Sequence, residues 1–121
     1  MLDYEVRNCE RYRRFMSLVY VNHGRGARFR DICGDMMRHS DELIEFDSSS
    51  ALLMGETNIQ GALLAIDRFK RRCDAVADMR YAVVAYPADG RNAEDLLAAA
   101  NKRLASAKVL EAGAVVCSSA A

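Results

Sequence analysis

The sequence lacks an excess of charge of either sign, long apolar runs and closely spaced cysteines. Its 17 lysines and arginines equal its 17 aspartates and glutamates, so the formal net charge is zero. This balance argues against a generic nucleic-acid or polyanion binder. No apolar run has the length of a membrane span and no signal peptide opens the chain, so we expect no membrane insertion.

The four cysteines, at positions 9, 33, 73 and 117, form neither a CxxC motif nor a zinc-ligand spacing. We therefore expect no metal site, and no cofactor is predicted. Free cysteines of this kind are typical of a reduced compartment, which predicts a cytoplasmic protein. His23 and His39 are isolated in the sequence, and we interpret each as a surface or loop residue rather than a ligand.

The 121 residues are 51% hydrophobic, enough for a single folded domain over 1–121. Apolar periodicity predicts helices over 2–12, 27–39, 59–75 and 92–107, and strands over 15–21, 43–46, 51–54 and 79–86. Asn92 is the expected N-cap of the last helix. The tail, 109–121, is predicted to add an edge strand at 114–117. This order of elements predicts an α+β sandwich, in which helices flank one mainly antiparallel sheet.

The expected core combines alternating strand residues with residues that recur at helical spacing. Its members are Leu18, Phe29, Ile32, Ile44, Leu53, Leu63, Ile66, Val83 and Leu97. The basic runs at 11–14 and 70–72 are expected outside this core, on solvated helix faces.

Two strings carry a family resemblance. YAVVAYPADGRNAEDLLAAANKRLASAK (Tyr81 to Lys108) is similar to the closing strand, the YP-x-DG turn and the last helix of GGDEF domains, the diguanylate cyclase family. RHSDELIEFDSSSALLM (Arg38 to Met54) is similar to the RxxD motif, strand, signature tip and return strand of the same family. The resemblance implies a ferredoxin-like fold of the palm type found in nucleotidyl cyclases.

The chain departs from this family at the signature tip. The tip residues are Asp47, Ser48, Ser49, Ser50 and Ala51. The family's glycines, which let the backbone approach a triphosphate, are missing. Serines also replace the carboxylates that the family needs on Mg²⁺ for two-metal phosphoryl transfer from one GTP to another.

Further departures lie outside the tip. Asn22 stands where the resemblance implies the other metal carboxylate, and a neutral amide is a poor ligand for a hard cation. The segment that helps to hold guanine is expected to be deleted at Gly24–Gly26. Lys108 matches a phosphate-contacting lysine of the family, although a solvated lysine at a helix C-terminus explains it equally well. Together these losses predict that the chain is not an enzyme.

Unlike the signature tip, the RxxD motif matches the pattern of the family. Arg38 and Asp41 resemble the inhibitory product site of the family, which binds cyclic di-GMP, commonly as an intercalated dimer, and Arg68 matches the arginine that completes it. A guanidinium can pair with phosphate or with guanine O6 and N7. The resemblance implies that the carboxylate accepts hydrogen bonds from the guanine N1–H and N2–H₂ groups. The alternative is that Asp41 satisfies backbone N–H groups at a turn.

Two functions therefore stay open. The first is an inactive GGDEF-like domain that acts as a cyclic di-GMP receptor through Arg38, Asp41 and Arg68. The second is a nucleotide-free protein-interaction or dimerisation domain, in which the entry helix over 1–12 connects to a partner or an adjoining domain. An active cyclase is the third reading, and the missing metal ligands argue against it.

Overall fold

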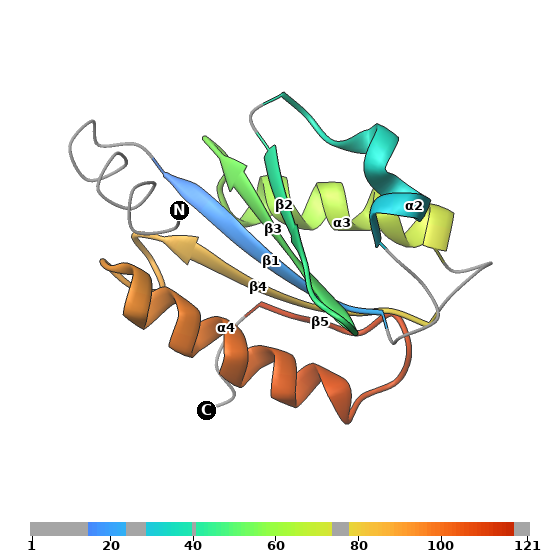
Figure 1. The fold of residues 1–121 in the computed structure, drawn as a ribbon. Helices are drawn as coiled ribbons and strands as arrows, with labels where there is room; N and C mark the ends of the chain where they lie inside the picture. The colour runs from blue at the N-terminus through green and yellow to red at the C-terminus, as the bar shows by residue number, and fades with distance from the viewer. Residues whose placement is uncertain (1–14, 24–28, 40, 74–77, 118–121) are drawn as a thin grey trace.

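The computed structural model describes residues 15–23, 29–39, 41–73 and 78–117 (Figure 1). The predicted entry helix over 2–12 lies outside these residues, as do the basic run at 11–14 and Cys9. Among the described residues, the elements follow in the order strand, helix, two strands, helix, strand, helix, strand. This order agrees with the sequence prediction from the first strand onward. None of the described helices is long and apolar enough to cross a membrane.

Five strands form one sheet in the order β2-β3-β1-β4-β5. Their bounds are β1 Met16–Asn22, β2 Asp41–Glu45, β3 Ser49–Gly55, β4 Arg80–Tyr86 and β5 Val115–Val116. The first four strands in this order pair antiparallel, and β5 joins β4 in parallel. The prediction of an α+β fold with a mainly antiparallel sheet is confirmed.

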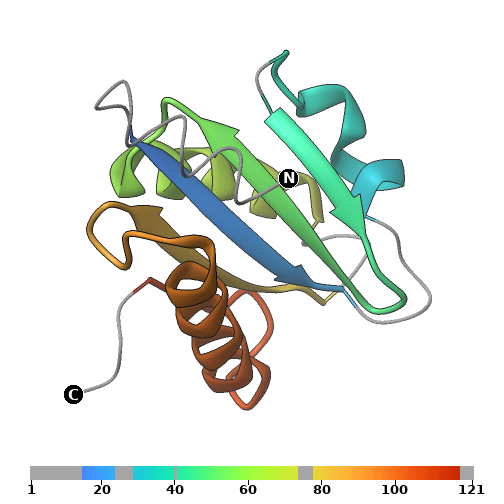
Figure 2. The same cartoon turned by 60° about the vertical axis from the view of Figure 1, so that its left-hand side comes forward.

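Helices cover both faces of the sheet, as predicted. Helices α2 (Phe29–Cys33) and α3 (Ile59–Cys73) lie on one face, and α4 (Ala93–Lys108) lies on the other (Figure 2). The helix predicted over 27–39 is shorter than expected: a 3₁₀ turn, Gly34–Met36, follows α2, and Met37 is extended. Glycine is a poor helix former, which accounts for a break at Gly34. Asn92 caps α4 as predicted, because its side chain accepts a hydrogen bond of 2.8 Å from the backbone N of Asp95.

The alternation of side chains along β1 and β3 divides the core in two. Val19 and Leu52 pack towards α2 and α3, together with Phe29 and Phe69. The alternate residues, such as Leu18, pack towards α4. Since both central strands are apolar on both faces, the sheet forms the middle layer of a sandwich.

Most of the predicted core is confirmed. Leu18, Phe29, Leu53, Ile66 and Val83 are buried, and Ile32 and Leu63 are partly buried against the same cluster.

Two core predictions are wrong, because Ile44 and Leu97 are exposed. Helix α4 packs on β4 and β1, whereas Ile44 lies on the edge strand β2, at the other side of the sheet. Leu97 lies on the flank of α4 that borders this uncovered part of the sheet. The local patterns predict the helix and the strand, but they carry no information on how far across the sheet α4 reaches.

A buried ion pair ties α4 to the turn after β4. Arg103 is 5% exposed, and its Nη2 donates to Asp89 Oδ1 over 2.7 Å while its Nη1 donates to the carbonyl of Val83 over 2.8 Å. Asp89 also accepts from the backbone N of Ala85. Burial alone would raise the pKa of Asp89, but the hydrogen bonds from Arg103 and Ala85 and the charge of Arg103 outweigh it and lower that pKa.

Candidate functional site

The hairpin of β2 and β3 carries the predicted site residues at its two ends. We call one end the corner; it comprises Arg38, Asp41, Gly55 and Thr57, where the chain enters β2 and leaves β3. The other end is the tip; it comprises residues 46–50 together with Asn22 and His23 at the end of β1. The two ends differ in their polar contacts.

At the corner, Arg38 and Asp41 form a closed pair. The backbone N of Arg38 donates to Asp41 Oδ2 over 2.8 Å, and the backbone N of Asp41 donates to the carbonyl of Arg38 over 3.0 Å. The guanidinium adds bonds from Nη2 and Nε to Asp41 Oδ1, of 3.0 and 3.3 Å. The carboxylate therefore satisfies a backbone N–H group, as the alternative reading of the motif expected, and also holds the arginine.

This pairing buries the aspartate. The side chain of Asp41 is 2% exposed, whereas that of Arg38 is 48% exposed. Asp41 therefore does not project into solvent beside Arg38. A carboxylate at a turn binds the nearest donors, and here these donors belong to its own motif.

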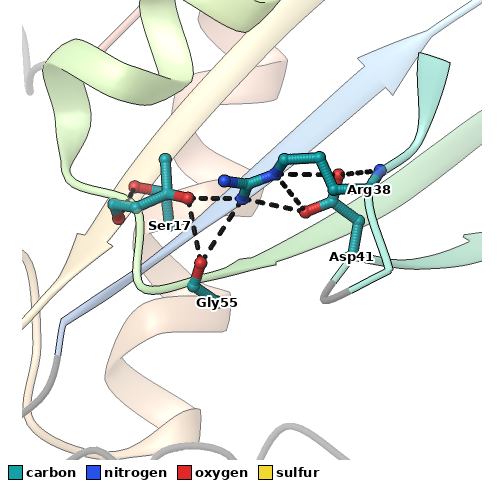
Figure 3. Close-up of polar contacts among 5 residues, drawn as sticks. Ser17, Arg38, Asp41 and Gly55 are labelled. Atoms are coloured by element: carbon teal, nitrogen blue, oxygen red, sulfur yellow. Dashed lines mark hydrogen bonds and ion pairs between the residues drawn. The ribbon is translucent and has the colours of Figure 1, made fainter.

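Arg38 also reaches across to the segment between β3 and α3 (Figure 3). Its Nη2 donates to Thr57 Oγ1 over 2.6 Å and lies 3.4 Å from the carbonyl of Gly55. The carbonyl of Thr57 accepts from Ser17 Oγ in β1 over 2.8 Å. Arg38 Nη1 has no hydrogen-bond partner among the described residues. One nitrogen of the guanidinium thus stays available while the rest is fixed.

Arg38 also lines a pocket of about 290 Å³. Arg38 and Arg68 both line it, together with Phe15 and Glu56, while Asp41 is not among its lining residues. Arg68 is exposed on α3 and makes no hydrogen bond or ion pair with another described residue. The structure therefore brings Arg38 and Arg68 to one pocket and keeps Asp41 behind Arg38.

At the tip, the polar side chains contact one another. His23 Nε2 lies 2.9 Å from Ser50 Oγ, and the backbone N of His23 donates to the carbonyl of Ser48 over 3.0 Å. His23 and Ser50 are both buried, and Ser50 is only 1% exposed. His23 lies in the loop directly after β1, as one of the two alternatives expected, but it is buried rather than at the surface. Its position directly after an apolar strand, opposite the serines of the hairpin, was the signal that sequence reasoning missed.

The tip is also shorter than predicted. Ser49 and Ser50 belong to β3, and the backbone N of Phe46 donates to the carbonyl of Ser49 over 2.8 Å to close the turn. Ala51 is buried in the core on the α4 side. Only residues 46–48 join the two strands. Ser49 pairs with Asn22 of β1, which brings together two positions where the family resemblance implies metal carboxylates.

The donor set at the tip does not fit a divalent hard cation. Asn22 supplies an amide, Ser49 supplies a hydroxyl, and the hydroxyl of Ser50 is already bonded to His23. Mg²⁺ prefers carboxylate oxygens, and Asp47 at the exposed turn is one carboxylate alone. Across the described ranges, no three His, Cys, Asp or Glu side chains gather closely enough to hold a metal. Lys108, the last residue of α4, is exposed, and the predicted deletion at 24–26 lies outside the described residues.

Comparison of the chain with solved structures identifies the architecture. The GGDEF domain of YfiN (also called TpbB) from Pseudomonas aeruginosa matches 99% of this chain and 92% of its own length, with a TM-score of 0.77 and 16% identity. The active GGEEF domain of a diguanylate cyclase from Vibrio cholerae matches 99% of this chain and 93% of its own, with a TM-score of 0.69 and 9% identity. The chain has a GGDEF-like fold.

An EAL/GGDEF domain protein from M. capsulatus gives a similar result, with a TM-score of 0.71 and 16% identity over 97% of this chain and 93% of that protein. No protein-family model and no curated protein matches the sequence. The likeness therefore concerns the fold, and the function has to be argued from the residues at the corner and the tip.

Proposed function

We propose that this GGDEF-like domain is a cyclic di-GMP receptor without diguanylate cyclase activity, and that it passes ligand occupancy to a protein partner or an adjoining domain. One observation carries the proposal: Arg38 and Arg68 line the same pocket at the corner, whereas the tip is occupied by the buried His23–Ser50 pair. The pocket at one end of the hairpin is lined by two arginines, whereas at the other end the side chains of His23 and Ser50 are buried and bonded to each other.

The charges of the pocket support an anionic ligand. The residues that line the pocket include two arginines, Arg38 and Arg68, and one carboxylate, that of Glu56. Hydrogen bonds from a guanidinium to a phosphate are charge-assisted and stronger than neutral ones. Because Arg68 is unpaired among the described residues, it binds a ligand without first breaking an ion pair.

The tip supports the absence of catalysis. Two-metal phosphoryl transfer requires carboxylates that hold both cations near the reacting phosphate. Asn22, Ser49 and Ser50 supply neutral oxygens, and the Ser50 hydroxyl is engaged with His23. We therefore expect no turnover of GTP.

A second function has an observation of its own. The exposed side chains of Ile44, Phe46 and Leu97 line an apolar groove of about 240 Å³ on the α4 side of the sheet, with Tyr20 at its floor. Exposed apolar surface of this kind favours contact with another protein surface. A nucleotide-free interaction or dimerisation domain is accordingly the alternative.

Calorimetry distinguishes the two functions. The receptor binds cyclic di-GMP with micromolar affinity or better, and Arg68→Ala weakens binding by about tenfold to a hundredfold, the loss of one charged hydrogen bond. Arg91→Ala is the matched control, since Arg91 is also exposed and unpaired among the described residues but is not one of the residues that line the pocket. It leaves the affinity unchanged. The stoichiometry distinguishes a single ligand from an intercalated dimer.

A chromatographic assay tests the enzymatic part. Purified protein with GTP and Mg²⁺ produces no cyclic di-GMP. Turnover that disappears on Lys108→Ala would overturn the proposal of an inactive domain. Absence of micromolar binding, or equal binding by Arg68→Ala and wild type, would overturn the receptor and favour the interaction domain.

A further inference from the structure

The corner pocket differs from a guanine-specific site because its polar groups already form hydrogen bonds within the protein. The carboxylate expected to accept from the guanine edge, that of Asp41, already accepts from the backbone and guanidinium of Arg38 and is 2% exposed. To bind the two donors of a guanine edge, it would have to release those bonds and move into solvent. Asp41 is therefore a positioning residue, which orients Arg38.

Arg38 is restricted in the same way. Its Nε and Nη2 together face Asp41, and Nη2 also donates to Thr57. An arginine reads guanine O6 and N7 through two nitrogens that form a fork. With only Nη1 available, Arg38 supplies a positive charge and single hydrogen bonds, which suit a phosphate oxygen but do not form that fork.

Neighbouring polar groups are committed as well. Thr57 Oγ1 accepts from Arg38 and donates to the carbonyl of Gly55, and Asn58 Oδ1 accepts from the backbone N of Gly61. Glu56, the one carboxylate among the lining residues, also makes an interaction of its own.

An aromatic face completes the pocket. Phe15 lines it and is 46% exposed, directly before β1 and on the side of the sheet where Arg68 lies. A base stacks on an exposed aromatic ring whatever its edge carries, because every base has a π-face. The pocket, about 290 Å³ in volume, is at the small end of the range for ligand sites. It suits one phosphodiester and one base.

We infer that Arg38 Nη1 and Arg68 bind the phosphodiester while Phe15 stacks on the base, so that the pocket accepts purine cyclic dinucleotides without distinguishing guanine from adenine. This inference rests on the proposed receptor function and narrows it. The ligand class is a purine nucleotide phosphodiester, recognised by its charge and its flat face.

Competition titration tests the inference on the intact chain. A fluorescently labelled cyclic di-GMP is displaced by unlabelled cyclic di-GMP and, separately, by cyclic di-AMP. We expect the two affinities to agree within about threefold, because no edge of the base is read. Phe15→Leu, which keeps the apolar bulk and removes the ring, weakens both by about fivefold to a hundredfold. Phe46→Leu is the matched control, because Phe46 is also exposed but lies in the groove on the other face, and it leaves both unchanged.

The outcomes separate the inference from the function on which it rests. A preference for cyclic di-GMP above about thirtyfold would overturn the inference and leave the receptor standing, and loss of that preference in Glu56→Gln would identify the group that reads guanine. Equal affinity in Phe15→Leu and wild type would overturn the stacking role. Absence of binding by either dinucleotide would overturn the receptor itself. The comparison of the two dinucleotides uses wild-type protein, so it does not depend on how a variant folds.

Discussion

The two ends of the β2–β3 hairpin differ in what their polar side chains bind. At the tip, His23 and Ser50 are buried and form a hydrogen bond with each other. At the corner, Arg38 is half exposed and Arg68 is exposed, and both border a pocket that opens to solvent. One short hairpin thus has a buried, hydrogen-bonded pair of side chains at one end and an open pocket lined by two arginines at the other.

Because the two ends differ in this way, they should contribute differently to the free energy of unfolding and to ligand affinity. A buried polar pair contributes to stability, because removing one partner leaves the other without its hydrogen bond away from water. An exposed arginine contributes little to stability and remains available to a ligand. Substitution of Ser50 at the tip should therefore change the free energy of unfolding, whereas substitution of Arg68 at the pocket should mainly change affinity.

The largest change in the free energy of unfolding is expected outside the hairpin, at the buried ion pair of Asp89 and Arg103. The smaller changes expected at the two ends of the hairpin are compared with it. Asp89→Ala leaves the buried guanidinium of Arg103 without its charge partner and should lower the free energy of unfolding by about 3–5 kcal/mol. Urea unfolding followed by circular dichroism measures this change. A loss below about 1 kcal/mol would contradict the assignment of a buried ion pair.

The same pair predicts a pH dependence. The folded-state pKa of Asp89 is lowered, below the value of about 3.9 expected in the unfolded chain. The stabilisation of the folded state by ionised Asp89 is therefore fully present above about pH 4, and it is lost as the pH falls through the folded-state pKa. Urea unfolding of wild type between pH 6 and pH 3 should show this loss, and Asp89→Asn should reduce it. Identical acid profiles for the two proteins would exclude Asp89 as a source.

At the tip, Ser50→Ala should lower the free energy of unfolding by about 1–3 kcal/mol, since it removes the hydroxyl that faces His23 in a buried site. Ser49→Ala is the matched control, because Ser49 is less buried and its hydroxyl has no hydrogen-bond partner among the described residues. The affinity for cyclic di-GMP should stay unchanged in both variants. Loss of affinity in Ser50→Ala alone would place the ligand at the tip and break the comparison.

At the corner, Arg38→Ala should lower the free energy of unfolding by about 1–2 kcal/mol and also weaken ligand binding. The stability cost arises because the buried carboxylate of Asp41 loses its guanidinium donors and keeps the backbone donor. Arg38 therefore has a structural role in addition to its place at the pocket. Calorimetry and urea unfolding of Arg38→Ala and Arg38→Lys measure the two effects separately.

The smallest effect on stability is expected for Arg68→Ala, within about 0.5 kcal/mol, because no described residue bonds to that guanidinium. Binding should nevertheless fall by about tenfold to a hundredfold. This variant is the sharpest test of the difference between the two ends. A large loss of stability without a change in affinity would reverse the roles of the two ends.

The sequence by itself determined the local elements. Short apolar runs predict all four longer strands to within two residues at each end, and the prediction that Asn92 caps α4 is confirmed. These features depend on residues that are close in the chain, so periodicity and residue type report them directly. The pairing of Arg38 with Asp41 is equally local, since the two residues are three apart and meet at one turn.

Only the tertiary structure decided which of these residues are covered and which are available. His23 meets Ser50 across 27 positions of sequence, and Phe15 and Arg68 come to one pocket from opposite ends of the described β1–α3 region. Ile44 has a strand pattern like that of Leu53 but lies where α4 does not reach. Local patterns determine towards which face of its element a side chain points. Whether that side chain is buried or accessible depends on which distant element packs against it, and this packing forms only when the sheet and its helices assemble.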